Sequence, residues 1–134
     1  MKKIILAILI GITLTGCGNK LKCTKTIKND VMSQKITYKI HKNKNEIKEV
    51  ETIEKYEIYN EDINENYDYL LSFRFEDLNN NNIKYDYSHK GNKYNLTTTY
   101  DFSTMSEETI TSYIGTKDAD EYTNKLINEG FICK

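Results

Sequence analysis

The sequence predicts one α+β domain built on a mostly antiparallel sheet, and two periodicities indicate it. Apolar and polar residues alternate with a period of two over 21–40, less regularly over 46–58, and again over 83–102. A helical spacing of three and four residues separates these stretches at 61–78 and returns near the C-terminus. We therefore expect a three-strand meander, a helix, a hairpin and a C-terminal helical segment that pack as a single unit.

The first two strands of the meander are clear period-two segments. Their inward-facing positions share an apolar character and are Leu21, Cys23, Ile27, Met32, Ile36, Tyr38 and Ile40. Lysines, threonines and His41 occupy the opposite face. Asn29 and Asp30, and then the polar residues 42–45, are turn signals.

The third strand, over residues 46–58, has an ambiguous period. Four residues alternate, Val50, Thr52, Tyr56 and Ile58, whereas Ile47 and Ile53 fall out of phase. The β-branched and aromatic content favours a long, bulged strand over a helix.

The main helix is predicted over residues 61–78, with Asn60 as its N-cap. The residues that recur at three and four are Ile63, Tyr67, Leu70, Leu71, Arg74 and Leu78. Residues Asn79 to Asn82 end this helix. The hairpin follows, with Ile83, Tyr85 and Tyr87 on the inner face of one strand, a turn at 90–92, and alternation to Phe102 in the other strand.

Two shorter helices are predicted near the C-terminus. Thr104 and Glu107 have the spacing of a capping box, which predicts that a short helix starts there. A last helix runs from about Asp118 to Glu129, with Gly130 as its stop signal. Its apolar face comprises Ala119, Tyr122 and Leu126.

The N-terminus has the features of an export signal. Lys2 and Lys3 precede residues 4–16, which carry no charge and are mostly aliphatic. This apolar run is shorter than the roughly 20 residues that a membrane span needs, and it fits a cleaved signal peptide.

The signal ends in Leu14-Thr15-Gly16-Cys17, which resembles the lipobox of bacterial lipoproteins at all four positions. The resemblance implies that residues 1–16 are removed and that Cys17 carries a diacylglycerol as the first mature residue. An alternative is that Cys17 is buried at the end of an uncleaved anchor. Because two or more acyl chains hold a protein stably on a bilayer, the lipobox predicts membrane anchoring at the extracytoplasmic face. Residues 17–20 are then a short tether, and residues 21–134 are the domain.

Composition limits the possible partners. Removal of residues 1–16 leaves 118 residues with 17 basic and 20 acidic side chains, a net charge of −3. This weak and mixed charge argues against nucleic acid, and it contains no polybasic or acidic block. The heavy use of Asn, Lys, Ile and Tyr matches AT-rich codons and indicates a low-GC Gram-positive bacterium.

Cys23 and Cys133 remain as a pair if Cys17 carries lipid. An exported domain can keep a disulfide, which would tie the two ends of the chain together and stabilise it by roughly 4 to 5 kcal/mol in the chain-entropy model. The alternatives are two buried thiols or a metal site. Without a nearby histidine, zinc is disfavoured.

A weaker resemblance connects the mature chain with the small YehR-like lipoproteins of bacteria, whose activity is uncharacterised. The similar stretches are Cys23-Thr24-Lys25, Ile36-Thr37-Tyr38, Ile83-Lys84-Tyr85 and Thr99-Tyr100-Asp101-Phe102. The C-terminal Phe131-Ile132-Cys133 departs from that pattern. The resemblance implies no catalytic residue.

Motifs that carry chemistry are sparse. His41 and His89 each lie beside a predicted turn, without a second ligand at metal spacing. Two segments partly imitate a calcium loop, Asp77 to Ser88 and Asp118 to Glu129, but the first lacks the final glutamate and the second lacks the central glycine. Both are more simply helix ends or caps. We expect neither a metal nor another cofactor.

The eleven tyrosines could form a sugar-stacking or peptide-binding face. However, Tyr85, Tyr87, Tyr94 and Tyr100 fall on the predicted inner face of the hairpin, which favours a core role for them.

These observations favour a membrane-anchored binding or interaction module of the cell envelope, without catalytic activity. Its partner would be an envelope protein, a cell-wall component or a small ligand, and one small domain is too short for a two-lobed solute receptor. The alternative is a surface hydrolase that uses acidic pairs such as Glu107 with Glu108, or Asp118 with Asp120. These acids also suit helix N-termini. A third hypothesis is assembly through an exposed sheet edge, which predicts an edge strand with few lysines or glutamates.

Overall fold

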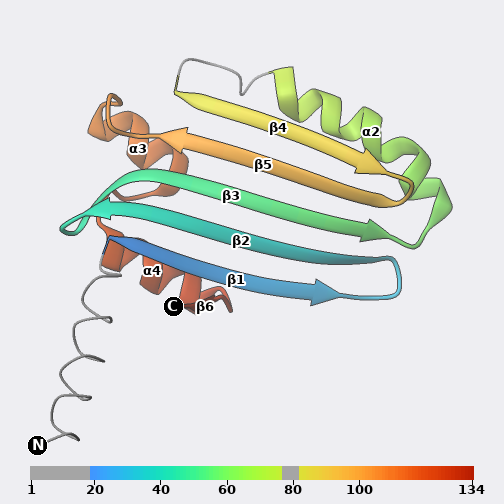
Figure 1. Ribbon diagram of the computed structural model, residues 1–134, viewed down its shortest axis with the longest axis horizontal. Coiled ribbons are helices and arrows are strands. Elements are labelled where there is room, and N and C mark those ends of the chain that lie inside the picture. Colours follow the sequence, from blue (N-terminus) through green and yellow to red (C-terminus); the bar gives the residue numbers. More distant parts are fainter. Residues whose placement is uncertain (1–18, 77–81) are drawn as a thin grey trace, which may run out of the picture.

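The computed structural model describes residues 19–76 and 82–134, and for residues 72–76 it describes the backbone alone. Its centre is one antiparallel sheet of six strands in the order β4-β5-β3-β2-β1-β6, with helices at both ends of one face (Figure 1). The α+β class, the meander, the hairpin and the C-terminal helical segment are as predicted. The expected lipid-bearing Cys17 and the signal segment lie outside the described residues, as do Leu78, Asn79 and the start of the first calcium-like segment.

The meander comprises β1 (Lys20–Lys28), β2 (Met32–Asn43) and β3 (Glu46–Ile58). Residues 46–58 form a strand, as predicted, and its register with β2 shifts between His41 and Lys42. This bulge explains why Ile47 and Val50 are both buried in spite of their odd spacing. Ile53 lies on the other face, opposite Thr37.

The hairpin comprises β4 (Ile83–Lys90) and β5 (Lys93–Asp101), joined through Gly91 and Asn92. Gly91 has a φ of 61°, which glycine adopts at little cost. β5 pairs with β3, so the hairpin continues the sheet directly from the meander.

The sixth strand, β6 (Ile132–Cys133), was not predicted from the sequence, because two residues are too few to show an alternation. It pairs with β1, and Cys133 lies directly opposite Cys23. The two cysteines form a disulfide across a sequence separation of 110 residues. Backbone hydrogen bonds join Lys22 and Lys134 in both directions, at 3.0 and 2.9 Å.

The helix α2 (Glu61–Glu76) begins where it was predicted. The side chain of Asn60 caps it, since its Oδ1 accepts a hydrogen bond from the amide of Ile63 at 3.0 Å. Ile63, Tyr67 and Leu71 pack on the sheet. Leu70, predicted as part of this apolar face, is 58% exposed.

The C-terminal helices are α3 (Glu107–Ile114) and α4 (Ala119–Asn128). The prediction that Thr104 caps α3 is wrong, because the N-cap is Ser106, whose hydroxyl accepts a hydrogen bond from the amide of Thr109. Thr104 instead donates to the side chain of Asn82 at 2.9 Å. α4 lies as predicted, capped by Asp118. Gly130, with a φ of 95°, follows its end.

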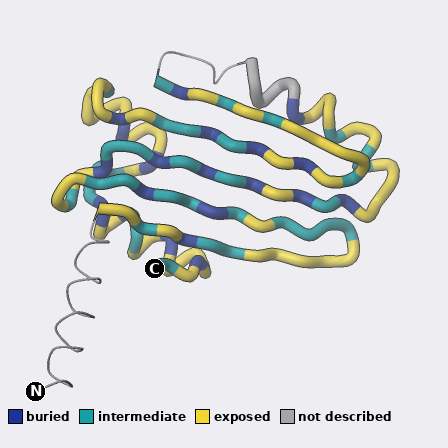
Figure 2. The backbone as a smooth tube through the Cα atoms, in the orientation of Figure 1, coloured by how far each residue is buried: buried dark blue, intermediate teal, exposed yellow. Residues whose placement is uncertain are grey.

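Two hydrophobic clusters share the helix-covered face of the sheet. One lies under α3 and α4 and includes Cys23, Ile40, Val50, Tyr122 and Leu126. The other lies under α2 and comprises Tyr56, Ile58, Leu71, Tyr94 and Leu96, with partly buried neighbours. Along β3, buried residues alternate mainly with partly buried ones (Figure 2). The described elements and both clusters are made by residues between 19 and 134, so a chain that begins at residue 19 retains all of them.

Candidate functional site

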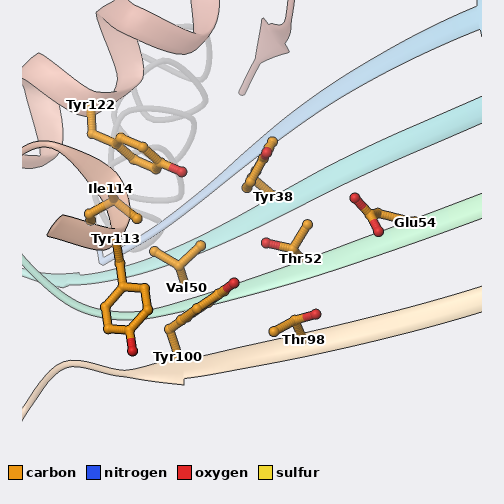
Figure 3. A pocket seen from close by; sticks show the side chains of 9 residues that line it. All are labelled: Tyr38, Val50, Thr52, Glu54, Thr98, Tyr100, Tyr113, Ile114 and Tyr122. Atoms are coloured by element: carbon orange, nitrogen blue, oxygen red, sulfur yellow. The ribbon is translucent and has the colours of Figure 1, made fainter. Parts of the chain in front are cut away.

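A polar pocket opens on the helix-covered face, at the edge of the cluster under α3 and α4 (Figure 3). It has a volume of about 120 Å³. β2, β3 and β5 form its floor, and α3 and α4 supply one wall. The nine lining residues are Tyr38, Val50, Thr52, Glu54, Thr98, Tyr100, Tyr113, Ile114 and Tyr122.

The floor exists because small polar side chains replace large apolar ones in the middle of the sheet. Tyr38, Thr52 and Thr98 lie side by side on three neighbouring strands. Both threonines are buried. Their short side chains leave space between the two clusters that a leucine or phenylalanine would fill.

Glu54 is the one charged side chain among the nine lining residues. It follows Thr52 on the inner face of β3 and is only 8% exposed. In Figure 3 its carboxylate lies at the end of the pocket opposite the helices. As an ionised carboxylate it offers only hydrogen-bond acceptors, so the one charge in the lining is negative.

Tyr122 of α4 closes the helical wall and is buried. Burial raises the pKa of its hydroxyl above the ordinary value of 10.0, and the nearby Tyr38, Glu129 and Tyr100 raise it further. Tyr122 therefore remains a neutral hydroxyl at physiological pH, able to donate and to accept hydrogen bonds. Its ring meets that of Tyr38 edge to face, with centroids 6.3 Å apart.

The remaining aromatic side chains form a second wall. The rings of Tyr100 and Tyr113 lie 5.7 Å apart, and Tyr100 also stacks on Phe102 at 5.9 Å. The hydroxyls of Tyr100 and Tyr122 point toward the other lining side chains in Figure 3. The arrangement thus combines hydroxyl groups, aromatic rings and one carboxylate.

The sequence interpretation of the hairpin tyrosines is confirmed for Tyr94, which is 2% exposed and donates to the Asn64 side chain at 2.7 Å. Tyr85 and Tyr87 pack around the cluster under α2. Tyr100 is the exception, because it also lines the pocket. Glu54 was missed, although the sequence contained a signal for it: an acid occupies the inward position between Thr52 and Tyr56.

The other candidate residues lie apart from the pocket. His41 pairs with Glu49 at 3.9 Å, and His89 pairs with Asp68 at 3.6 Å. Asp118 accepts from the amide of Glu121 and from the side chain of Asn45, each at 2.8 Å.

The remaining acids also act at helix ends. Asp120 lies in the first turn of α4, and Glu107 and Glu108 lie in that of α3. Glu107 forms an ion pair with Lys117 at 3.1 Å. Within residues 19–76 and 82–134, no three acidic, cysteine or histidine side chains converge as a metal site would require.

The sheet edges carry lysines. β4 forms one edge and presents Lys84 and Lys90, and the part of β1 beyond β6 presents Lys28. Lysines on an edge strand discourage the addition of another strand. These lysine-bearing stretches do not match the pattern that the assembly hypothesis requires, and β6, which carries neither lysine nor glutamate, is only two residues long.

Comparisons with known proteins add no assignment to this site. The chain matched no protein-family model, no curated protein and no solved structure. None of the helices in the described part of the chain is long and apolar enough to span a membrane.

Proposed function

We propose that this chain is a lipid-anchored, non-catalytic binding module on the extracytoplasmic face of a bacterial cell membrane, and that its pocket takes a small ligand with an ammonium group. The observation that carries the ligand class is the Glu54 carboxylate in a tyrosine-lined pocket. The anchor rests on the lipobox at Leu14 to Cys17.

The disulfide supports export of the domain. Disulfides persist in oxidising compartments and are rare in the cytosol, where thiols are kept reduced. The bond between Cys23 and Cys133 is therefore consistent with a mature chain outside the cytoplasmic membrane. Cys17 would then carry the acyl chains only two residues before the first described residue, Asn19.

The chemistry of the pocket favours a cation. A carboxylate attracts an ammonium group directly, and a charge-assisted hydrogen bond between them contributes about 1.5–3 kcal/mol. Tyrosine rings within about 6 Å of a cation add further attraction through their electron-rich faces. The hydroxyls of Tyr38, Tyr100 and Tyr122 can bind the neutral polar groups of the same ligand.

The size of the pocket limits the ligand to a few non-hydrogen atoms. Its volume of about 120 Å³ is slightly smaller than an engineered cavity of roughly 150 Å³ that binds benzene. We therefore expect a small amine or the amino end group of a larger envelope component. A polymer segment would exceed this space.

A binding role fits this pocket better than the alternative hydrolase. Glycosidic hydrolysis by carboxylates needs two of them at a fixed separation around the bond. Glu54 is the single carboxylate among the nine lining residues. The acidic pairs Glu107 with Glu108 and Asp118 with Asp120 lie at helix N-termini.

Nuclear magnetic resonance titration of residues 19–134 tests the ligand class. Ethanolamine should shift the signals of Tyr122 and Glu54 with a Kd of about the millimolar order, which is reasonable for a four-atom ligand. Ethylene glycol, which has the same size but no charge, should produce no saturable shift. The Glu54→Gln variant should bind ethanolamine about tenfold or more weakly, because the charge-assisted bond is lost.

The control variant is Glu57→Gln, which removes the same charge from the opposite face of β3. It should bind ethanolamine like the unmodified chain. Equal affinity for ethanolamine and ethylene glycol, or equal losses in the two variants, would rule out recognition of the ammonium group by Glu54.

The anchor is tested by the mass of the full-length protein extracted from its own membrane without reduction. The expected mass is that of residues 17–134 plus acyl chains, less two hydrogens for the disulfide. The Cys17→Ser variant should keep the signal segment and lack the lipid. An unlipidated mass of all 134 residues for the unmodified protein would contradict the anchor and leave the pocket titration unaffected.

A further inference from the structure

The face of the sheet opposite the helices is strongly basic. Both hydrophobic clusters lie on the other face, and no described helix packs against this one. The strand registers place nine lysines on it, namely Lys20, Lys22, Lys28, Lys35, Lys39, Lys55, Lys84, Lys90 and Lys93. The acids on the same face are Glu49, Glu51, Glu57, Asp86 and Asp101, together with Glu46, whose charge is offset by its ion pair with Lys48 at 3.0 Å. We call this surface the open face.

We infer that the open face docks on the anionic phosphate head groups of a lipid bilayer, with a lysine-ringed hollow at its centre as the principal phosphate site. The hollow has a volume of about 210 Å³ and is bounded by Lys22, Lys35, Lys39 and Lys55. Thr37 and Ile53 complete the lining.

The register concentrates positive charge around the hollow. Lys22 lies directly opposite Lys39 on β1 and β2, and Lys35 lies directly opposite Lys55 on β2 and β3. Like charges in such cross-strand positions destabilise a sheet. The two pairs lie on either side of Thr37, so an anion bound between them would relieve both repulsions.

Acidic side chains neutralise little of this charge. Among the described residues, the ion pair at the hollow joins Lys39 to Glu51 at 3.8 Å, and no acid pairs with Lys22, Lys35 or Lys55. Phosphate complements such a cluster, because a lysine ammonium acts as a compact point charge that attracts phosphate oxygens.

The charge of the whole chain makes this face distinctive. The open face has an excess of four positive charges, whereas the complete chain has a net charge of −1. The remaining surface is therefore acidic on balance. Such a separation orients a protein on an anionic plane and turns the opposite surface away from it.

The form of the surface and the position of the proposed anchor favour a bilayer as the occupant. The open face extends over five neighbouring strands, and a broad sheet surface can meet a membrane plane at several lysines at once. Cys17 is at most about 7 Å along the chain from Asn19, so the anchor would keep β1 close to the head groups. In this orientation the tyrosine-lined pocket faces away from the membrane.

Binding of residues 19–134 to vesicles tests the inference without a contribution from the anchor. The domain should sediment with phosphatidylcholine vesicles that contain phosphatidylglycerol, but not with vesicles of phosphatidylcholine alone. The Lys35→Gln/Lys55→Gln variant should bind the anionic vesicles about 25-fold more weakly, at roughly fivefold for each lysine. The control variant, Lys44→Gln/Lys125→Gln, changes the net charge equally in the β2–β3 turn and on α4, and it should lose less than about threefold.

Three results would overturn the inference. Equal binding to neutral and anionic vesicles would exclude the charged head groups. Equal losses in the two variants would show that net charge, and not the hollow, controls binding. Saturable binding of inorganic phosphate without any binding to vesicles would identify a free anion as the ligand in place of the bilayer.

Discussion

The side chain of Tyr122 is buried, and its hydroxyl lies near those of Tyr38 and Tyr100 and near the carboxylate of Glu129. Burial raises its pKa, and Tyr38, Glu129 and Tyr100 add to the effect in that order. The folded protein thus holds this proton more tightly than the unfolded chain, in which tyrosine titrates near pH 10. The stability of the folded state therefore depends on the proton that Tyr122 carries.

This difference predicts an alkaline loss of stability that depends on Tyr122. Below about pH 10 both states keep the proton, and the full stability is present. Above that pH the unfolded state ionises first, so the free energy of unfolding should fall by up to about 1.4 kcal/mol per pH unit. Urea unfolding between about pH 9 and 11 should show a smaller decline for Tyr122→Phe than for the unmodified chain.

Tyr69→Phe is the matched control for that experiment, because Tyr69 is 65% exposed. It should keep the alkaline decline of the unmodified chain. Identical pH profiles for Tyr122→Phe and the unmodified chain would contradict the assignment of the raised pKa to Tyr122.

At the residue scale, the alternation of apolar and polar residues predicted which side chains point inward, but it did not predict which of them line a pocket. The inward positions of Cys23, Tyr38 and Tyr100 follow from a period of two. The same rule places Glu54 inward, where it is buried, but a period of two carries no information on whether an inward acid lines a pocket. The pocket itself could not be predicted, because it depends on how Thr52 and Thr98 meet across two strands that are distant in the sequence.

Among the elements, β6 depends most on a covalent bond. It has two residues, and its pairing with β1 is limited to Cys23 with Cys133 and Thr24 with Ile132. Phe131, just before β6, is 8% exposed and packs against Tyr38 with ring centroids 5.2 Å apart. The disulfide thus holds the C-terminus against the cluster under α3 and α4.

Removal of the disulfide should destabilise the domain and release β6. We expect the Cys23→Ala/Cys133→Ala variant to lose about 2–5 kcal/mol of the free energy of unfolding in urea. Hydrogen exchange at the amides of Lys22 and Lys134 should accelerate more than exchange in β3. Each of these amides donates to the backbone carbonyl of the other residue, and both hydrogen bonds are lost when β6 is released. An unchanged free energy of unfolding would show that the disulfide contributes nothing to stability.

The predicted elements differ from the structure mainly at their ends and in β6. Long periodic segments such as β2 and α2 show enough repeats to define their type. The spacing of Thr104 to Glu107 imitates a capping box, but the chain is still turning there, with the Met105 amide bonded to the Phe102 carbonyl. Such a turn depends on where β5 ends, which the local sequence does not reveal.

For the molecule as a whole, strand order determines where charge accumulates. The lysines of the open face are spread from residue 20 to residue 93 and form no block in the sequence. They gather only because β5 lies beside β3 and β1 beside β2. The weak net charge of the sequence therefore concealed a basic surface that the sheet assembles.

The same assembly predicts that the lysine hollow lowers the stability of the free protein. Replacement of Lys35 and Lys55 by glutamine removes one directly opposed like-charge pair, so Lys35→Gln/Lys55→Gln should raise the free energy of unfolding by about 0.5 kcal/mol at low salt. The control is Lys28→Gln/Lys84→Gln, which removes two lysines of the open face that lie opposite Ser33 and Thr99. It should change stability less.

Salt provides an independent measure of the same repulsion. Between about 0.01 M and 1 M salt the Debye length falls from about 30 Å to 3 Å, which screens the opposed lysines. The free energy of unfolding of the unmodified chain should then rise more than that of Lys35→Gln/Lys55→Gln, so that the two proteins converge. A variant that is both more stable and weaker on anionic vesicles would separate binding from structural support, because a residue needed only for folding cannot produce that combination. A variant that is less stable would mean that the lysine stems contribute more by packing over Thr37 and Ile53 than their charges remove by repulsion.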